Sequence, residues 1–172
     1  MAEAPFGNPR TDANLSMGPL MNQAGLDKVA ALVDSARKQG AQVRTGGRVA
    51  DRPGFHYEPT VLVDCTDAMD VMTQEIFGPV LPIRVVDSLD EALALANNSD
   101  YGLTSSVFTQ DLNAAMKAAS ELRFGETDIN REHFEAMQGF HAGRRKSGIG
   151  GADGQHGLYE YMETQVVYLQ TQ

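Results

Sequence analysis

Apolar residues along the first 130 positions alternate between helical and strand spacing, and this alternation limits the chain to a small set of folds. From Leu26 to Ala36 they recur every third or fourth position, which is typical of an amphipathic helix that stops before Gly40. Strand-like segments cover residues 41–44, 57–63, 80–86, 103–109 and 126–130, and helix-like segments at 88–98 and 111–125 separate the last three. We therefore predict an α/β fold with an open, mostly parallel twisted sheet and flanking helices.

Local signals define several of these elements. The run Val80–Val86 is almost continuously apolar, as in a strand that is buried on both faces, and Pro82 within it indicates an edge or a bulge. Ser88 and Glu91 have the spacing of a capping box, and Asp111 is placed to cap the next helix, which carries an apolar stripe. The stripe consists of Ala115, Met116, Ala119 and Leu122.

The two ends of the chain differ from its middle. Residues 1–20 are predicted to form an extended lead-in, and regular patterning is lost between Asn130 and residue 160. Long irregular stretches in compact domains usually serve a function or an interface. Residues 162–169 are rich in Val, Tyr and Thr, which predicts a strand at the C-terminus.

Composition and charge exclude several classes of function. The formal net charge is −9 and there is no long Lys/Arg run, so the chain would repel a polyphosphate backbone and we expect no nucleic-acid partner. No window approaches the roughly 18 apolar residues of a membrane span, and the N-terminal segment has no apolar core of a secretory signal. Cys65 is the only cysteine, which excludes an intrachain disulfide and suits a reducing compartment. We expect a cytoplasmic protein without a membrane partner.

The motifs that suggest nucleotide or metal binding are incomplete in this sequence. Lys146-Ser147 matches the end of a Walker A loop, but Arg145 and Phe140 occupy the positions of its glycines. The segment 148–153 (GIGGAD) begins like a dinucleotide fingerprint but ends in Asp where the third glycine is needed. The four histidines lack the spacing of metal ligands, so we expect no metal site. Aspartates surround Cys65, and since negative charge raises a thiol pKa, we expect a packing role for it.

Five collinear blocks of the chain carry a resemblance to one enzyme family. The most specific is residues 74–80 (QEIFGPV), which is similar to the E-x-F-G-P-V segment of the aldehyde dehydrogenase superfamily. The other blocks are residues 17–20 (MGPL), 57–62 (YEPTVL), 97–103 (NNSDYGL) and 145–150 (RKSGIG). The last block departs from the K-x-S-G-x-G pattern of the family, because Arg145 stands in place of the first Lys.

The resemblance covers residues 7–170 and extends to a subfamily. Residues 130–143 and 165–169 are most similar to lactaldehyde and glycolaldehyde dehydrogenases, which oxidise short α-hydroxyaldehydes to hydroxy acids. The resemblance implies three parts of the chain: a lead-in at residues 1–20, part of the catalytic domain at 21–160, and a C-terminal oligomerisation strand at 161–172. That strand would add to a sheet of a neighbouring subunit in a homo-oligomer, and the alternative is an edge strand folded back on its own domain.

The resemblance also implies a two-step reaction whose catalytic groups are absent from this chain. In this family a cysteine attacks the aldehyde, the thiohemiacetal passes a hydride to the nicotinamide, and a glutamate-activated water hydrolyses the thioester. The cofactor domain, the nucleophilic cysteine and the general-base glutamate lie upstream of the G-P-L block, so no catalytic residue is assigned here. We therefore expect a C-terminal fragment of an NAD(P)-dependent dehydrogenase of short (hydroxy)aldehydes. It would be inactive alone, and NAD or NADP would bind only in the intact enzyme.

Four residues carry binding roles by this resemblance. Glu75 would accept hydrogen bonds from the nicotinamide-ribose hydroxyls, and Phe77 would pack along that ribose. Taken without the family, the same pair would be a helix-end carboxylate and a core phenylalanine. His141 and Phe134 would line the substrate pocket, where a histidine can donate to a substrate hydroxyl. The alternative for His141 is a solvated loop histidine.

Some alternatives stay open at the level of sequence. The basic cluster Arg144, Arg145 and Lys146 could pair with acids across a subunit boundary, although a solvated turn is expected. An apolar face and a sheet edge left uncovered by truncation would favour self-association or marginal stability. A second hypothesis for the function is a non-catalytic assembly or binding module on the same fold. A third is an unrelated acidic α/β protein that binds a small molecule.

Overall fold

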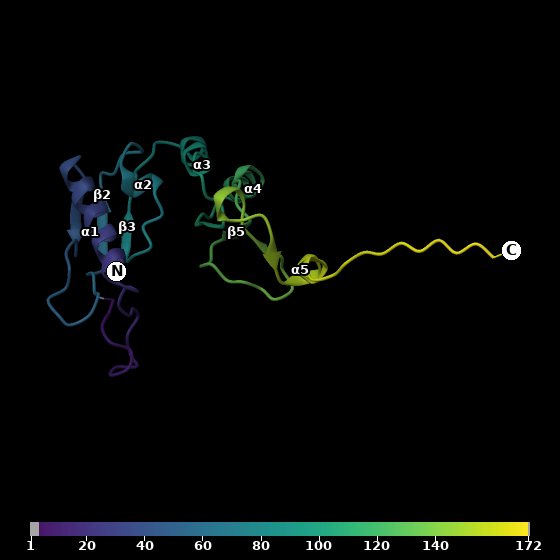
Figure 1. Ribbon diagram of the computed structural model, residues 1–172. Coiled ribbons are helices and arrows are strands. Elements are labelled where there is room, and N and C mark those ends of the chain that lie inside the picture. Colours follow the sequence, from purple (N-terminus) through teal and green to yellow (C-terminus); the bar gives the residue numbers. More distant parts are fainter. Residues whose placement is uncertain (1–3, 172) are drawn as a thin grey trace. The chain divides into compact units, whose positions relative to one another are not determined.

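The computed structural model describes residues 4–171 of the chain. The chain divides into two compact units, unit 1 within Met1–Val86 and unit 2 within Asp87–Gln172. Each unit combines helices with a small sheet, so the predicted α/β class is confirmed (Figure 1). The described strands form three separate sheets, where the sequence pattern suggested one.

Unit 1 consists of a long helix, a three-stranded sheet and a helix of one turn. Its elements in chain order are α1 (Gln23–Lys38), β1 (Gln42–Thr45), β2 (Thr60–Val63), α2 (Asp70–Thr73) and β3 (Val80–Pro82). The strand order is β1-β2-β3, with β1 antiparallel and β3 parallel to the central β2. Figure 1 shows α1 lying along the strands of this sheet.

The core of unit 1 lies between α1 and the sheet. The Asn22 side chain accepts a hydrogen bond from the Gly25 N–H at 2.9 Å and caps the helix. The apolar face predicted from helical spacing is confirmed, since all its members are buried: Leu26, Val29, Leu32, Val33 and Ala36. Leu62 and Val80 from the sheet pack in the same core, and each fully buried aliphatic side chain contributes about 1.5–3 kcal/mol.

β3 is an edge strand and is shorter than the predicted segment 80–86. It pairs with β2 on one side only, and Pro82 has no N–H to offer on an open edge, as predicted from its position. Ile83 still donates its N–H to the Leu62 carbonyl at 2.9 Å. Regular pairing ends there, because the chain then leaves toward unit 2.

The segment 4–20 folds back on itself instead of running extended as predicted; residues 1–3 of the predicted lead-in lie outside the described range. A bridge joins Phe6 to Met17, and the Gly7 N–H donates to the Met17 carbonyl at 3.1 Å. Arg52 holds this loop, because its Nη1 donates to the Phe6 carbonyl at 2.6 Å and its guanidinium lies 4.4 Å from the Phe6 ring centroid. The Phe6 ring also lies 6.3 Å from the imidazole of His56.

His56 is buried, and its Nδ1 has no hydrogen-bond partner among the described residues. Burial lowers the pKa of this imidazole from its ordinary value of 6.5, and the nearby positive charge of Arg52 lowers it further. The folded chain therefore keeps His56 neutral at a pH where the unfolded chain already binds a proton.

We expect unit 1 to lose stability on acidification through His56. The contribution is fully present above 6.5, the ordinary pKa, and is lost as the pH falls through the lower pKa of the folded state. Urea unfolding between pH 7 and pH 5 should show a smaller fall of the midpoint in His56→Phe than in the unaltered chain. His156→Phe, at an exposed histidine of unit 2, is the matched control and should retain the full fall. Identical pH dependence in the unaltered chain and in His56→Phe would contradict this account.

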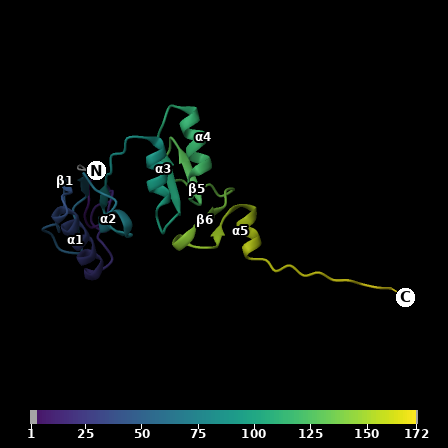
Figure 2. The ribbon, with the colours of Figure 1, turned by 90° about the horizontal axis from the view of Figure 1, so that it is seen from above.

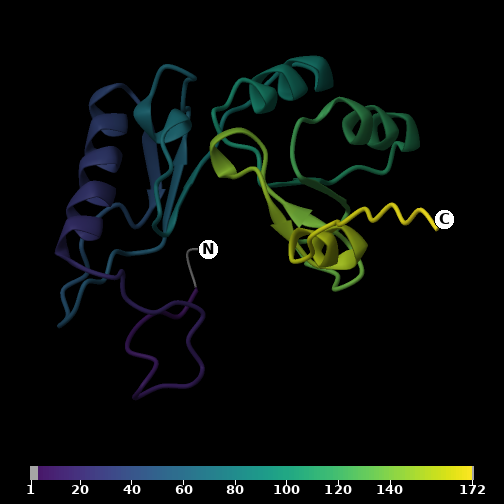
Figure 3. The same ribbon diagram turned by 45° about the vertical axis from the view of Figure 1, so that its right-hand side comes forward.

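Unit 2 contains two helices over a parallel strand pair, followed by a small hairpin and a last helix. Its elements are α3 (Leu89–Asn97), β4 (Thr104–Val107), α4 (Leu112–Glu121), β5 (Glu126–Ile129), β6 (His141–Ala142), the 3-10 helix η1 (Arg145–Ser147), β7 (Gly151–Ala152) and α5 (Gly154–Glu160). β4 and β5 are parallel, and β6 and β7 are antiparallel. Figure 2 shows α3 and α4 side by side. In Figure 3 these two helices lie on one side of the β4–β5 pair, and α5 with the hairpin lies on the other.

The predicted caps of unit 2 are confirmed, with one shift of register. Ser88 Oγ accepts from the Glu91 N–H at 3.1 Å, as a capping box requires. The Glu91 carboxylate reaches back to the N–H of Asp87 at 2.9 Å, one residue before the N-cap. Asp111 accepts from the Asn113 N–H at 2.8 Å and begins α4.

Unit 2 buries less apolar surface than the sequence pattern suggested. On α4, Ala115 and Ala118 are buried, but Met116, which was predicted on the buried stripe, is 63% exposed. All four residues of β4 and of β5 are half-buried.

Residues 162–169, predicted as a strand, form no ladder with another described segment, and their side chains are exposed. Figure 1 shows this segment leaving α5 as an extended chain; Gln172 lies outside the described residues.

Within residues 4–171, no helix combines the length and the apolarity that crossing a bilayer requires.

Candidate functional site

Glu75 and Phe77 lie between α2 and β3, and both side chains are exposed. Ile76 between them packs against the core of unit 1, so its two neighbours are kept at the surface. Lys28 of α1 donates to the backbone carbonyl of Glu75 at 2.5 Å and fixes the segment there. The Glu75 carboxylate itself has no hydrogen-bond or ion-pair partner among residues 4–171.

The backbone at Phe77 is in the left-handed region, with φ 55°. Bulky residues rarely adopt this conformation, and it persists only where the surroundings impose it. The next residue is Gly78, at which a Cβ would lie 2.5 Å from Cγ2 of Val29, so the segment presses directly on α1. The Phe77 ring is 74% exposed, and the alternative of a core phenylalanine is therefore wrong.

The two exposed side chains of this segment have the chemistry that a nicotinamide ribose would require, and their role in binding it remains a prediction. An ionised carboxylate only accepts hydrogen bonds and can hold two vicinal hydroxyls, and an exposed ring offers an apolar face to a sugar. Glu75 provides the free acceptor and Phe77 the exposed ring on one short, fixed segment.

His141 lies on β6 between two carboxylates. Its Nδ1 is 3.1 Å from Oε2 of Glu126, an ion-pair distance, although the angle is not that of a hydrogen bond. Its Nε2 is 3.3 Å from Oε1 of Glu135. The His141 side chain is 21% exposed, so the alternative of a solvated loop histidine is wrong.

Glu126 and Asp128 alternate along β5 and therefore face the same side of the strand pair. Asp128 lies 3.4 Å from Nε of Arg131 and 3.5 Å from Nδ1 of His133. These contacts fix the beginning of the irregular segment between β5 and β6. Sequence analysis missed Glu126 and Glu135 as partners of His141. The strand alternation could have identified Glu126, but no local pattern could have identified Glu135.

Phe134 lies on the segment between β5 and β6 and is 60% exposed. The contact that the structure records for its ring is with Arg131, whose guanidinium lies 4.8 Å from the ring centroid. Its place in a substrate pocket remains a prediction.

The basic cluster is exposed, as expected of a solvated turn, but two of its members also make bonds within the chain. Arg145 donates to the backbone carbonyls of Asn97 and Arg123, and Lys146 pairs with Asp100. The Lys146 ammonium, through its hydrogen bond and its charge, lowers the pKa of the Asp100 carboxyl. Both bonds lie within the chain, so neither needs a second subunit.

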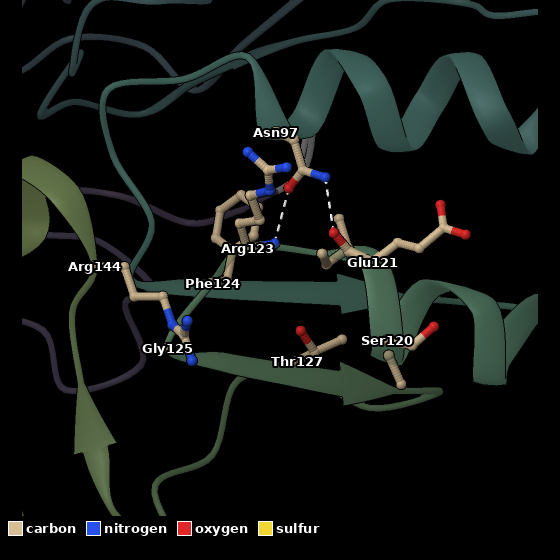
Figure 4. Close-up of a pocket in the computed structure, with 10 residues that line it drawn as sticks. Asn97, Ser120, Glu121, Arg123, Phe124, Gly125, Thr127 and Arg144 are labelled. Atoms are coloured by element: carbon tan, nitrogen blue, oxygen red, sulfur yellow. Dashed lines mark hydrogen bonds between the residues drawn. The ribbon is translucent and has the colours of Figure 1, made fainter.

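A cavity of about 750 Å³ opens near the C-terminal end of α4 (Figure 4). In Figure 4 the side chain of Asn97 bridges the backbone of Glu121 and Arg123, and Arg144 extends toward Gly125. The residues that line this cavity are largely polar, whereas pockets that bind small molecules are predominantly apolar. None of the four predicted site residues lines this cavity.

The single cysteine is not an activated nucleophile. Cys65 is 1% exposed, and burial raises the pKa of its thiol, with a smaller contribution from the charge of Asp64. The predicted packing role is confirmed by its place in the core of unit 1. Among the described residues, no group of three or more His, Cys, Asp or Glu is arranged to hold a metal ion.

Comparison with known proteins gives concordant results. A sequence model of the Aldehyde dehydrogenase family matches residues 1–167. Lactaldehyde dehydrogenase of Escherichia coli (strain K12) is 57% identical over 171 residues, which cover 99% of this chain and 36% of the relative. The 3,6-anhydro-alpha-L-galactose dehydrogenase of Streptomyces coelicolor is 42% identical over 161 residues, covering 91% of this chain and 33% of the relative.

Solved structures agree with these relatives. The crystal structure of lactaldehyde dehydrogenase from Escherichia coli superposes with a TM-score of 0.95 over 99% of this chain and 36% of its own. A betaine aldehyde dehydrogenase from Staphylococcus aureus, solved in complex with NAD⁺, is 36% identical and superposes with a TM-score of 0.85 over 92% of this chain and 33% of its own. This chain thus spans about a third of the length of the proteins it matches. Since the family match extends over nearly the whole sequence, the chain belongs to the aldehyde dehydrogenase family.

Proposed function

We propose that this chain is the C-terminal part of an NAD(P)-dependent aldehyde dehydrogenase and that it has no dehydrogenase activity by itself. The observation that carries the proposal is the state of its only cysteine, which is buried in the core of unit 1 with a raised thiol pKa. A thiolate is the species that attacks a carbonyl, and burial both disfavours the thiolate of Cys65 and keeps its sulfur away from a substrate.

The substrates of the intact enzyme are short aldehydes with a hydroxyl group next to the carbonyl. His141 supports this because its ring lies within ion-pair distance of Glu126 and Glu135, and its Nδ1 has no hydrogen-bond partner among residues 4–171. An imidazole N–H beside a carboxylate can donate to a hydroxyl group while the carboxylate accepts from it, and a plain alkyl aldehyde offers no such hydroxyl. Phe134 supplies an apolar wall on the adjacent segment. The 57% identity with a lactaldehyde dehydrogenase points the same way.

Glu75 and Phe77 hold the nicotinamide ribose in the intact enzyme. The free carboxylate accepts from the ribose hydroxyls, and the exposed ring supports the sugar. The bound nicotinamide would supply the hydride acceptor, and this chain contributes its orientation.

The intact enzyme is a cytoplasmic homo-oligomer in this proposal. Residues 161–172 supply the contact, as a strand added to a sheet of a neighbouring subunit. Support comes from Val166, Val167, Tyr168 and Leu169, whose apolar side chains are 67–94% exposed. An exposed apolar segment with unpaired backbone groups is suited to strand addition.

The test is an assay for NADH or NADPH formation with glycolaldehyde and lactaldehyde. We expect no turnover by the purified chain, and turnover when it is mixed with a polypeptide that carries the missing N-terminal two thirds of Escherichia coli lactaldehyde dehydrogenase. In that mixture, Glu75→Ala should lower kcat/KM by about 10- to 100-fold, since hydrogen bonds to a charged group contribute about 1.5–3 kcal/mol. Cys65→Ala is the control and should leave kcat/KM unchanged. Turnover by the chain alone, or a loss of turnover in Cys65→Ala equal to that in Glu75→Ala, would refute the proposal.

A further inference from the structure

The guanidinium of Arg145 connects two loops that are far apart in sequence. Its Nη1 donates to the carbonyl of Asn97, the last residue of α3, at 2.8 Å, and to that of Ser99 in the loop between α3 and β4. Its Nη2 donates to the carbonyl of Arg123, at 2.9 Å, in the loop between α4 and β5. Each loop leads directly into one strand of the parallel pair, so this side chain holds the beginnings of both strands.

Backbone bonds fasten the segment around Arg145 to the same place. The Arg144 N–H donates to the Gly102 carbonyl at 2.9 Å, and the Gly102 N–H donates to Oγ of Ser147 at 3.0 Å. Gly102 leaves room for both the Arg123 backbone and the guanidinium, because a Cβ there would lie 2.9 Å from the Arg123 carbonyl oxygen and 3.0 Å from Nη2 of Arg145. The backbone of Arg145 is left-handed, with φ 58°, a strained conformation that these bonds hold in place.

This attachment determines where β6 lies against β5. A Cβ at Gly125 would lie 1.5 Å from the carbonyl oxygen of Ala142, so the two backbones are in direct contact. The residue after Gly125 is Glu126 and the residue before Ala142 is His141, and their side chains meet at 3.1 Å. Arg145 follows β6 by only two intervening residues, so its anchoring limits how far β6 can move.

We propose that Arg145 is a positioning residue that sets His141 against Glu126 by fastening the segment after β6 to the two loops that begin β4 and β5. An arginine suits this task because its planar fork presents several N–H groups at fixed angles to carbonyls on both loops. A lysine carries its three N–H donors on a single ammonium group at the end of a flexible chain. It therefore binds fewer of these carbonyls at a fixed geometry. The importance of this positioning for catalysis rests on the proposed function, but the positioning itself does not.

The experiment observes the imidazole of His141 in the 172-residue chain. Long-range ¹H–¹⁵N spectra resolve the ring nitrogens of the histidines, and His141→Gln identifies the signals of His141. In Arg145→Ala we expect these signals to shift and broaden, and we expect the Ala142 amide to exchange with solvent at least tenfold faster. Arg145→Lys should restore part of both effects. Arg144→Ala, which removes a neighbouring guanidinium with no partner among residues 4–171, is the matched control and should change neither.

Several outcomes distinguish positioning from general stability. The amide signals of α4, which carries the buried residues Ala115 and Ala118 of unit 2, report whether unit 2 of a variant is folded. Unchanged His141 signals in a folded Arg145→Ala chain would overturn the proposal. If Arg145→Ala does not fold, Arg145→Lys keeps the positive charge but loses the planar fork, and it should shift the same His141 signals by a smaller amount. Unchanged His141 signals in a folded Arg145→Lys chain would also overturn the proposal. The measurement needs no turnover. A result that overturns the positioning role of Arg145 can therefore be distinguished from a failure of the proposed function.

Discussion

Leu62→Ala will lower the free energy of unfolding of unit 1 by about 3 kcal/mol, within the 2–5 kcal/mol usual for large-to-small changes in a core. Leu62 is fully buried on β2, the central strand of the sheet. Truncation removes its contacts with the core and leaves a cavity between the sheet and α1. Because small domains are stable by only about 5–15 kcal/mol, the loss is a large part of the total. Urea unfolding followed by circular dichroism should show a lower midpoint with an unchanged slope.

Leu81→Ala is the matched control on the neighbouring strand. Leu81 pairs with Val61 in the same sheet, but its side chain is 46% exposed. The same atoms are removed from a position that already contacts water, so we expect a change below about 1 kcal/mol. Equal shifts for the two variants would mean that the sheet does not cover a core in solution.

The elements that could be predicted from the sequence are those whose determinants are local. The periodicity from Leu26 to Ala36 predicted both α1 and its buried face, because the apolar stripe and the core that it enters are the same residues. The caps at Ser88 and Asp111 predicted the starts of α3 and α4, since each cap is a bond between near neighbours in sequence.

Tertiary contacts account for the features that were not predicted. Met116 has the spacing of a buried residue but is exposed, and the residues that α4 buries are the small Ala115 and Ala118. The role of Arg145 depends on carbonyls more than twenty residues away, which no local pattern contains. The C-terminal strand is a different case. Its sequence favours a strand, but a strand requires a partner, and no described segment of this chain pairs with it.

The candidate site also has one part that could be predicted from the sequence and one part that could not. The motif around Glu75 and Phe77 was recognisable because it is a contiguous block, and the structure adds that both side chains are exposed while Ile76 packs inward. The partners of His141 were not recognisable, because Glu126 comes from β5 and Glu135 from an irregular segment. A prediction that tests this second part of the site therefore has to disturb the contact between β5 and β6.

Gly125→Ala will separate β6 from β5 and destabilise unit 2 by about 3 kcal/mol, at the upper end of the usual cost of overpacking. A Cβ at this position would lie 1.5 Å from the Ala142 carbonyl oxygen, which is backbone and cannot rotate away. The hairpin must move as a whole, and His141 moves with it away from Glu126. We expect a lower urea midpoint for unit 2 and faster amide exchange at Ala142 and Gly151.

Gly150→Ala is the control for adding a methyl group to a glycine of the same unit. The nearest atom to a Cβ there is Oε2 of Glu160 at 3.9 Å, on a flexible side chain, so the methyl group fits without displacement. Replacing glycine by alanine at such a position is neutral or stabilises by about 0.4–1 kcal/mol, because the unfolded chain loses conformational freedom. If Gly125→Ala behaved like Gly150→Ala, β6 would not be in contact with β5 in solution. His141 would then have no fixed carboxylate partner on β5, and the selection of hydroxyaldehydes that we propose for it would lose its physical basis.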